Sequence, residues 1–513
     1  MPKSSRPHSS KGYPAHTRKG RRQRQAKWAK KQAKKVRRMA VQHTSRSLTA
    51  YGFFYPMALY LIEVLHLKEA FACQISLTHQ GNTFTVADFC ITLIVLPILG
   101  IERISHIDDK LKGEGTLATM LGMTRFCCQK ALHGFLNQCS GWQVRQLSRI
   151  NRDLINAQVQ TVEQGLHPLE MRMVDIDAST RSTEGKKREK AKPGKNSKAK
   201  GKDSYVWSIA TFSGLIIAQI LDSGNVHCKR HLQPLLTKAA QILDRIDLLR
   251  IDGGYLLGVA DLNFLLLRPY AFITKVKANL KSVQAAIAKA NPQDWQRVNK
   301  STALLDAGCV LLFEGAIRPV RLVVVRARRR VKRTKKGRVY YETKTIYWGL
   351  VTNLEGETFF FQGKARKLSA LWLYRLYKKR WTIENTFKTM HQAFNTGKLP
   401  SHRFRANQCY LVFMSLAYNA TVLFQRHLLT KEAQRWTWGT TRRRLLCVPA
   451  LVEITEDTVV MTFQADFPYK KLHRLVVVRL TRLLAKGEAV SQKWRTGRSK
   501  QPDENQIVIK KVA

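Results

Sequence analysis

The sequence predicts an α/β fold in which helices cover a mixed sheet, and three observations lead to this prediction. Between residues 171 and 278 the expected elements follow the order strand, strand, strand, helix, strand, helix, strand. Residues 49–170 show helical periodicity, and residues 279–364 show strand-like runs between turn signals. We therefore expect a mixed sheet with flanking helices, interrupted by a β-rich insertion and preceded by an all-helical N-terminal domain.

The charge of the chain indicates a polyanionic partner. The 513 residues include 89 Lys and Arg against 35 Asp and Glu, a net charge of +54. Such an excess repels itself in a compact chain unless an anion neutralises it, and nucleic acid phosphates do so with release of counterions. A membrane surface is the alternative, but the basic residues are spread over the whole chain rather than along one amphipathic helix.

Cysteine usage and hydropathy favour a cytoplasmic, nucleoid-type location. Nine cysteines occur without a CxxC pair, which fits neither a disulfide framework nor a zinc site. The most apolar run, Phe89–Ile101, is too short to span a bilayer and contains Pro97. The basic N-terminus lacks the apolar region of a signal peptide, so we expect no membrane association. We also expect no nucleotide cofactor, because there is no GxxxxGK[ST] loop.

Residues 1–48 form a basic tail. In Arg18–Arg38, twelve residues are Lys or Arg and Trp28 is the only aromatic residue. A block of like charges with so little apolar surface is disordered when free. We expect it to contact phosphates without sequence preference; a tail that only faces solvent is the alternative.

Residues 49–170 contain two helical segments, Glu102–Leu111 and Leu117–Leu136. The second resembles a helix-turn-helix in which Gly122 is the turn and Thr124–Leu132 is the helix that enters a groove. A plain helical core fits the same pattern and is the interpretation that we favour.

From residue 171 onward strands dominate. The segment MRMVDIDAST is expected to be a strand that ends at Asp175 and Asp177, which point to the same face because side chains alternate along a strand. The elements expected after it are the hairpin Tyr205–Phe212 and Leu215–Leu221 with its turn at Ser213–Gly214, the helix Arg230–Arg245, the strand Leu248–Asp252, the helix Leu256–Leu267 and the strand Tyr270–Lys275.

The second half of the chain combines the β-rich insertion with further helices. In residues 279–364 we expect a largely antiparallel region with a basic hairpin tip at Arg328–Arg338. Its strands are expected at Val310–Phe313, Arg318–Arg328, Arg338–Thr345 and Tyr347–Thr352. After it we expect a helix over Tyr374–Phe394, a buried helix over His402–Leu429, a hairpin of Ala450–Ile454 and Thr458–Phe463, a basic helix over Leu472–Ala485 and a polar tail.

The predicted helix Tyr374–Phe394 carries two distinct faces. At about 100° per residue, one stripe is apolar and is expected to be buried; it comprises Trp372, Leu376, Ile383, Phe387, Met390 and Phe394. A second face carries Tyr377, Arg380, Glu384, Lys388 and His391. A surface helix with ordinary i,i+4 ion pairs is the simpler interpretation.

Three carboxylates, Asp177, Asp252 and Glu384, can be assembled at the ends of these elements, with Asp175 as the alternative to Asp177. Clustered carboxylates repel one another, and divalent cations remove that repulsion. A pair of Mg²⁺ ions in such a site can activate water for phosphodiester cleavage, and Mn²⁺ can substitute. Alternatively, the two aspartates only begin turns. We prefer Asp177 because it is nearer the expected strand end and small residues follow it.

These residues carry a resemblance to a known family. Tyr377-x-x-Arg380-x-x-x-Glu384 is similar to the Tyr–Arg–Glu–Lys signature of insertion-sequence transposases of the DDE class, which move an element by cut and paste. The contexts IDAST and RIDGGY look like those of the first and second aspartates of that family. The signature lysine would fall at His391, and Lys388, one turn closer, lies on the same face.

The resemblance implies a ribonuclease-H-like catalytic domain and a division of the chain into six parts. These are a basic disordered tail (1–48), a helical DNA-binding domain (49–170), the first part of the catalytic domain (171–278), the β-rich insertion (279–364), the second part with the Glu helix (365–430), and a C-terminal hairpin, basic helix and tail (431–513). It also implies that Asp177, Asp252 and Glu384 bind two Mg²⁺ ions. DNA phosphates would be held by Tyr377, Arg380, Lys388, His391, Arg329, Arg330, Lys332 and Arg333.

The activity implied is that of a transposase, an endonuclease that also joins DNA. It would bind the terminal inverted repeats of its element in double-stranded DNA, cleave at each end by two-metal hydrolysis and join the freed 3′-hydroxyl ends to target DNA. A homodimer on DNA is expected because two ends must be cut together. The alternatives are a catalytically inactive nucleic-acid-binding relative and a structure-specific nuclease of the same fold.

Overall fold

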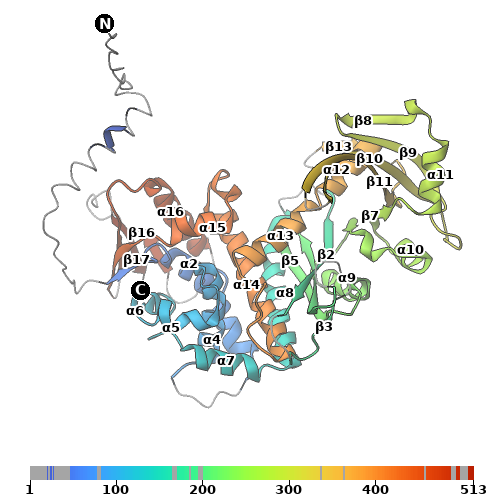
Figure 1. Cartoon of the computed structure of the whole chain (residues 1–513). Coiled ribbons are helices and arrows are strands. Elements are labelled where there is room, and N and C mark those ends of the chain that lie inside the picture. The colour runs from blue at the N-terminus through green and yellow to red at the C-terminus, as the bar shows by residue number, and fades with distance from the viewer. Residues whose placement is uncertain are drawn as a thin grey trace, which may run out of the picture. The chain divides into compact units, whose positions relative to one another are not determined.

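The structure is a computed structural model of the whole chain (Figure 1). It describes residues 47–77, 83–164, 170–183, 187–194, 200–335, 338–356, 358–361, 364–455, 458–486, 493–496 and 506–512, and before these only 20, 23–25 and 27. The predicted tail 1–48 therefore lies almost wholly outside the described residues. Residues 48–513 form one compact unit and residues 1–47 form another.

One large sheet organises the compact unit of residues 48–513. In the described part of the chain it has ten strands in the order β3-β4-β2-β6-β7-β11-β10-β9-β8, with β5 on the free side of β4. Strands β2, β6 and β7 are parallel, and β4 is antiparallel to both β2 and β5. The strands are β2 (Met173–Ser182), β3 (Lys192–Pro193), β4 (Asp203–Phe212), β5 (Leu215–Ser223), β6 (Leu248–Ile251), β7 (Ala271–Lys277), β8 (Trp295–Asn299), β9 (Thr302–Val310), β10 (Val320–Lys335) and β11 (Arg338–Thr352). A mixed sheet is thus confirmed.

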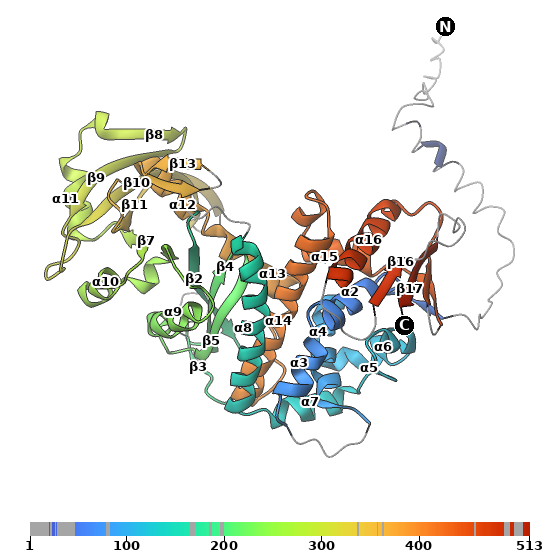
Figure 2. The ribbon, with the colours of Figure 1, turned by 180° about the vertical axis from the view of Figure 1, so that it is seen from behind.

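Helices cover both faces of this sheet (Figures 1 and 2). On the face that carries Asp175 and Asp177 lie α12 (Ala370–Lys378), α13 (Trp381–Gln392), α14 (Phe404–Leu428) and α8 (Gly141–Gln164). On the other face lie α9 (Leu232–Ala240) and α11 (Lys281–Lys289); α10 (Val259–Leu266) follows β6 in the chain. The apolar sheet residues are therefore buried from both sides, as in layered α/β proteins.

The N-terminal helices share one hydrophobic core with α14 and the C-terminal region. They are α2 (Tyr55–Leu59), α3 (Leu67–Gln74), α4 (Val86–Leu99), α5 (Ile107–Leu111), α6 (Gly115–Met120) and α7 (Gln129–Gln138). A capping box of Thr85 and Asp88 begins α4, the apolar run noted above. Among the described residues, no helix is both long and apolar enough to cross a bilayer.

A second, smaller sheet lies at the C-terminal end of the chain. Its strands follow the order β1-β14-β15-β17-β16, so the start of the compact unit pairs with its end. The bounds are β1 (Leu48–Thr49), β14 (Ala450–Ile454), β15 (Thr458–Thr462), β16 (Lys493–Thr496) and β17 (Gln506–Val512). Helices α15 (Trp438–Thr441) and α16 (Lys470–Lys486) complete this region, and β12 (Thr358–Phe361) pairs separately with β13 (Lys364–Lys367).

Two sequence predictions about local elements are wrong. The predicted second helix at Thr124 does not form, because residues 121–128 separate α6 from α7, and this exceeds the turn of about 3–4 residues in a helix-turn-helix. Leu117, Ala118 and Leu121 are buried, as a plain helical core requires. The predicted strand Val310–Phe313 is also displaced, since β9 ends at Val310.

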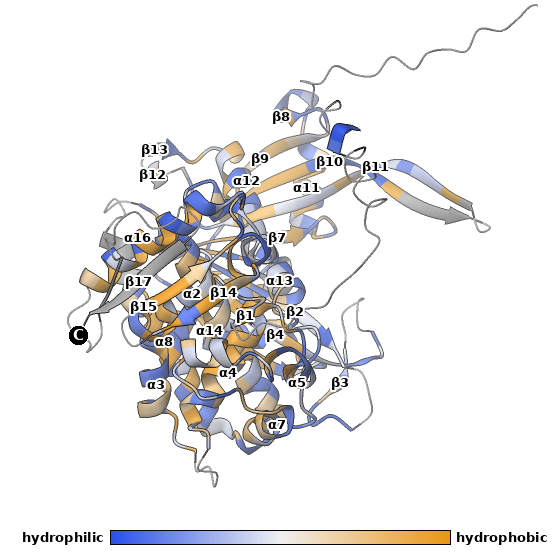
Figure 3. Cartoon of the chain, turned by 90° about the vertical axis from the view of Figure 1, so that its left-hand side faces the viewer, coloured by the Kyte–Doolittle hydropathy of each residue, from blue (hydrophilic) through white to orange (hydrophobic). Residues whose placement is uncertain are grey.

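The β-rich strands extend the central sheet, because β11 pairs with β7 from Trp348 to Thr352. Strand β10 pairs with β9 only as far as Ala327, so beyond it β10 and β11 continue as a two-stranded ribbon (Figure 3). Most of the basic residues predicted for a hairpin tip therefore lie along strand β10, and residues 336–337 are outside the described part.

The junction between β7 and β11 is close-packed at Gly349. A Cβ atom there would lie 2.6 Å from Val276 Cγ2 and 2.9 Å from Leu322 Cδ1. We expect Gly349→Ala to lower the free energy of unfolding by about 1–3 kcal/mol, because the added methyl forces packed side chains apart. Urea denaturation measures the change. Gly113→Ala, where no atom lies within 4 Å, is the control; equal stability of both variants would contradict this packing.

Candidate active site

The two aspartates of the candidate site meet at the edge where the parallel strands end. Ile176 on β2 is paired with Ile251, the last residue of β6, so Asp177 and Asp252 are neighbours across the two strands. The prediction that β2 ends at the aspartates is wrong, because β4 pairs with β2 as far as Ser182. The edge exists nevertheless, because β6 stops and its chain turns at Gly253 into a short 3₁₀ helix, η4 (Gly253–Tyr255).

Glu384 reaches this edge from the first turn of α13. The predicted single helix Tyr374–Phe394 is wrong: it is broken at Lys379 and Arg380. The buried Arg250 donates from Nη1 to the carbonyl of Leu376 at 2.8 Å, and the Arg380 amide bonds instead to the carbonyl of Tyr377 at 3.0 Å. A side chain from β6 thus takes the acceptor that an uninterrupted α-helix would use for Arg380.

Most of the predicted buried stripe is nevertheless confirmed. Leu376, Ile383, Met390 and Phe394 are buried, whereas Trp372 and Phe387 are only partly covered. Phe387 packs edge-on against Trp207 of β4, with ring centroids 5.5 Å apart. This contact holds α13 against the sheet and so fixes the position of Glu384.

The Arg380 guanidinium lies between three carboxylates. Its Nη1 is 2.8 Å from Asp177 Oδ2, and its Nη2 is 3.1 Å from Glu384 Oε1 and 3.8 Å from Asp252 Oδ1. The structure therefore brings together the three acidic residues expected from the sequence. They come from β2, from the turn after β6 and from α13.

Asp177 and Arg380 are the buried members of this group. Their side chains are 18% and 8% exposed, against 48% for Asp252 and 52% for Glu384. Burial raises the pKa of the Asp177 carboxyl, while Arg380 and the Ala178 amide oppose that rise. Burial acts to lower the pKa of Arg380, but the neighbouring acidic groups, Asp177 first among them, together more than offset it, so this pKa lies above its ordinary value. The cluster is thus an ion-pair network with two of its carboxylates open to solvent.

Asp175 has a different environment from Asp177. Both of its oxygens accept from Arg250, at 2.6 Å from Nε and 2.8 Å from Nη2, and Thr382 Oγ1 adds a contact at 3.2 Å. The carboxylate and the guanidinium are each about 6% exposed. A carboxylate with both oxygens committed to a buried partner is not available to a ligand, and this supports Asp177 as the first acid of the site.

The donor chemistry of the site suits a hard divalent cation. Mg²⁺ prefers carboxylate oxygens and retains water ligands, and Asp252 and Glu384 are exposed enough to allow both. Within the described ranges, no three His, Cys, Asp or Glu side chains are close enough together to hold a metal ion. Arg380 supplies the positive charge between these carboxylates.

The other predicted contact residues are not all at this site. Tyr377 is buried, its hydroxyl makes no hydrogen bond within the described residues, and Arg380 lies 5.6 Å from its ring centroid. Burial raises the pKa of Tyr377 far above its usual value. Lys388 is exposed on α13, whereas His391, in its last turn, lines a separate pocket described below.

The predicted basic residues of the insertion lie on the β10–β11 ribbon. Arg329 and Arg330 are exposed on β10, and the Arg330 guanidinium lies 5.0 Å from the ring centroid of Tyr341. Lys332 and Arg333 belong to the same strand, but their side chains lie outside the described part.

Three residues near the site were missed by the sequence analysis. Arg250 and Thr382 hold Asp175, and the exposed Lys275 on β7 lies beside Asp252, since Thr274 is paired with Ile251. Lys275 also places its amine 5.1 Å from the ring centroid of Trp348. Because side chains two residues apart on a strand share a face, the position of Arg250 two residues before Asp252 could have indicated it. No feature of the neighbouring sequence indicates Thr382 or Lys275.

Comparisons with known proteins identify the family of the chain. A profile of the family described as "Transposase DDE domain group 1" matches residues 61–485. The chain is similar to a solved structure of the piggyBac transposase synaptic complex with hairpin DNA, with 12% identity and a TM-score of 0.39, over 78% of this chain and 82% of that one. A Mos1 transposase paired-end complex with left transposon end matches at 13% identity and a TM-score of 0.12, over 36% and 56% of the two chains. No curated protein matches the chain.

Substitution of Asp175 and of Asp252 is expected to lower the stability by very different amounts. Asp175→Asn leaves Arg250 buried and unpaired, so we expect a loss of about 3–5 kcal/mol in the free energy of unfolding. Asp252→Asn removes only an exposed, long ion pair, which is worth less than about 1 kcal/mol. Chemical denaturation of both variants checks this, and a stable Asp175→Asn protein would contradict the structural role given to Asp175.

Proposed function

The chain belongs to the transposase DDE domain group 1 family, and from that premise we propose that it cleaves DNA at the ends of its mobile element and joins the 3′-hydroxyl ends to target DNA. The observation that carries this proposal is the meeting of Asp177, Asp252 and Glu384 on one guanidinium. The order β5-β4-β2-β6-β7, with β4 antiparallel, supports a ribonuclease-H-like catalytic domain.

Asp177, Asp252 and Glu384 would hold two Mg²⁺ ions, or Mn²⁺ in their place. When bound, these ions activate a water and stabilise the leaving oxygen in phosphodiester cleavage. The protein's part is to hold its carboxylates still: Asp177 is fixed by the Ala178 amide at 2.8 Å, and Glu384 by the packing of α13. Asp175 keeps its ion pair with Arg250, and this pair fixes the position of α12 and α13 against β6 through Leu376 and Thr382.

Arg380 has two roles in this proposal. Without DNA it neutralises the carboxylates; in the complex it turns to a phosphate oxygen near the cut, to which a guanidinium can donate two hydrogen bonds. Tyr377 lies beneath it and limits its movement. Lys388 and His391 follow on α13 and would contact the same DNA backbone.

Double-stranded DNA is the partner that the charge supports. A net charge of +54 favours a polyanionic partner, and Arg329, Arg330, Lys332 and Arg333, all on β10, would contact duplex phosphates. We propose the six-part domain division given above, with residues 49–170 as the helical DNA-binding domain, and a homodimer on paired element ends. A non-catalytic DNA-binding relative and a nuclease without strand transfer are the outcomes that the tests below separate.

The first test of this function is Asp252→Asn. We expect the rate of DNA cleavage with Mg²⁺ to fall by at least about 10³-fold, because the site loses one of its three carboxylate ligands. The affinity for DNA should be retained or rise, because a negative charge is removed. The cleavage rate is measured on a labelled duplex that carries the element ends, and the affinity for DNA is measured by fluorescence anisotropy. Asp261→Asn, in α10, is the control. Unchanged cleavage would refute the site; cleavage without joining would identify a nuclease.

The second test concerns the competition between Arg380 and the metal ions. In Arg380→Gln the three carboxylates lose their internal cation, so we expect Mn²⁺ to bind more tightly in the absence of DNA. Isothermal titration with Mn²⁺ measures this without any need for activity. Lys378→Gln, an exposed change on α12, should leave the affinity unchanged. Weaker Mn²⁺ binding by Arg380→Gln would show that the guanidinium supports the metal site rather than competing for it.

A further inference from the structure

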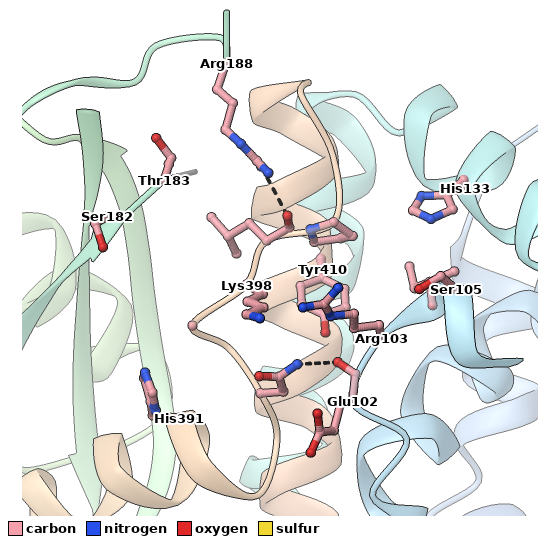
Figure 4. Close-up of a pocket in the computed structure, with 15 residues that line it drawn as sticks. Glu102, Arg103, Ser105, His133, Ser182, Thr183, Arg188, His391, Lys398 and Tyr410 are labelled. Atoms are coloured by element: carbon pink, nitrogen blue, oxygen red, sulfur yellow. Dashed lines mark hydrogen bonds between the residues drawn. The ribbon is translucent and has the colours of Figure 1, made fainter. Parts of the chain in front are cut away.

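A pocket of about 490 Å³ lies beyond the candidate active site, at the far end of α13. Figure 4 shows its walls. They come from residues 102–105 of the helical region, from Ser182 and Thr183 at the end of β2, and from His391 with the loop 395–400. The pocket thus lies between the sheet and the N-terminal helices.

The loop 395–400 is tied down on both sides. Asn395, in the left-handed conformation, donates to the carbonyl of Glu102, and Arg188 Nη1 donates to the carbonyl of Leu399 at 3.1 Å. Gly397 packs against the His391 ring, where a Cβ atom would lie 2.8 Å from Nε2. The pocket is therefore formed before any ligand binds.

The lining of the pocket is strongly basic. Arg103, Arg188 and Lys398 contribute three cations, and Glu102 is the single acid among the lining residues. Arg103 and Lys398 are exposed, and Figure 4 labels both among the residues that line the pocket. Such a concentration of positive charge selects an anion.

A buried cation next to this pocket strengthens the argument. Arg181 precedes Ser182 on β2 and is only 5% exposed, with its guanidinium 5.2 Å from the ring centroid of Trp207. Its Nε and Nη2 atoms make no hydrogen bond within the described residues. Burial lowers the pKa of Arg181 to about 10, and Arg181 in turn helps burial to lower the pKa of His391. Since a buried charge without a partner is costly, this one calls for an anion.

The pocket also has a defined place relative to the candidate active site. His391 is seven residues after Glu384 on the same helix, which is about 10 Å at 1.5 Å per residue. The pocket and Glu384 are therefore reached from the same helix.

We infer that this pocket binds a DNA backbone phosphate near the cut, through Arg103 and Lys398 in its lining and with the buried charge of Arg181 behind it. The inference rests on the proposed function and adds to it a second anchoring point for the DNA strand. His391, neutral at neutral pH, donates one N–H to the same phosphate rather than a charge. The loop 395–400 and the segment 102–105 thereby become part of the DNA-binding surface.

The test uses Arg181→Met in the full-length protein. We expect Arg181→Met to raise the melting temperature without DNA, because the variant removes an unpaired buried charge while the methionine keeps its apolar stem. We expect the same change to weaken binding of a fluorescent random-sequence duplex about tenfold, and to lower the slope of log affinity against log salt by about one. If Arg181 had only a structural role, Arg181→Met would instead lower the melting temperature.

Arg268→Met is the matched control. Its guanidinium also lies over a ring, 4.3 Å from the Phe264 centroid, but it has a partner in Gln233 at 3.0 Å. It should change neither the salt slope nor DNA affinity. A lower melting temperature for Arg181→Met together with unchanged DNA affinity would overturn the inference.

Lysine footprinting gives a local readout that does not depend on folding of a variant. The duplex should protect Lys398 from acetylation in the wild-type protein, but not Lys431, an exposed lysine in the loop after α14. If the duplex binds and is cleaved while Lys398 reacts as fast as without DNA, the pocket inference fails and the proposed function stands. If the wild-type protein neither binds nor cleaves DNA, the proposed function fails as well.

Discussion

The contact of one guanidinium with three carboxylates is the interaction on which the candidate site depends. Asp177, Asp252 and Glu384 come from separate elements and would repel one another if left unneutralised. Arg380 removes that repulsion within the chain itself, at 2.8 to 3.8 Å from the three groups. The protein can therefore fold with its acidic cluster complete before any metal ion arrives.

A second arginine makes this arrangement possible. Arg250 holds Asp175 with two hydrogen bonds and takes the carbonyl of Leu376, and so the helix breaks just before Arg380. Without that break Arg380 would continue the helix on α12 rather than cap the start of α13. The two arginines thus divide the carboxylates into a buried structural pair and an open cluster. The same division explains why two aspartates of one strand, two residues apart, have different roles.

The sequence was sufficient to predict the order of the elements and the three acidic residues. It was not sufficient to predict the long-range contacts between the elements. Apolar periodicity located β2, β4, β5, β6 and β7 to within a few residues, and the turn at Ser213 and Gly214 forms with both residues at positive φ. The break at Lys379 could not be predicted, because no Gly or Pro marks it and its cause lies in β6. The pairing of β11 with β7, which extends the sheet, is likewise a long-range contact with no local signal.

The buried arginines of the chain differ in how their charges are compensated. Arg380 and Arg250 are neutralised inside the fold by carboxylates, whereas Arg181 is equally buried and has hydrogen bonds left unmade. In a chain with 89 basic residues most lysines and arginines can remain in solvent at little cost. A buried arginine with unmade hydrogen bonds beside a basic pocket is costly, and the anion that we infer there would offset this cost. On this inference the anion is a phosphate of the DNA that reaches the candidate active site.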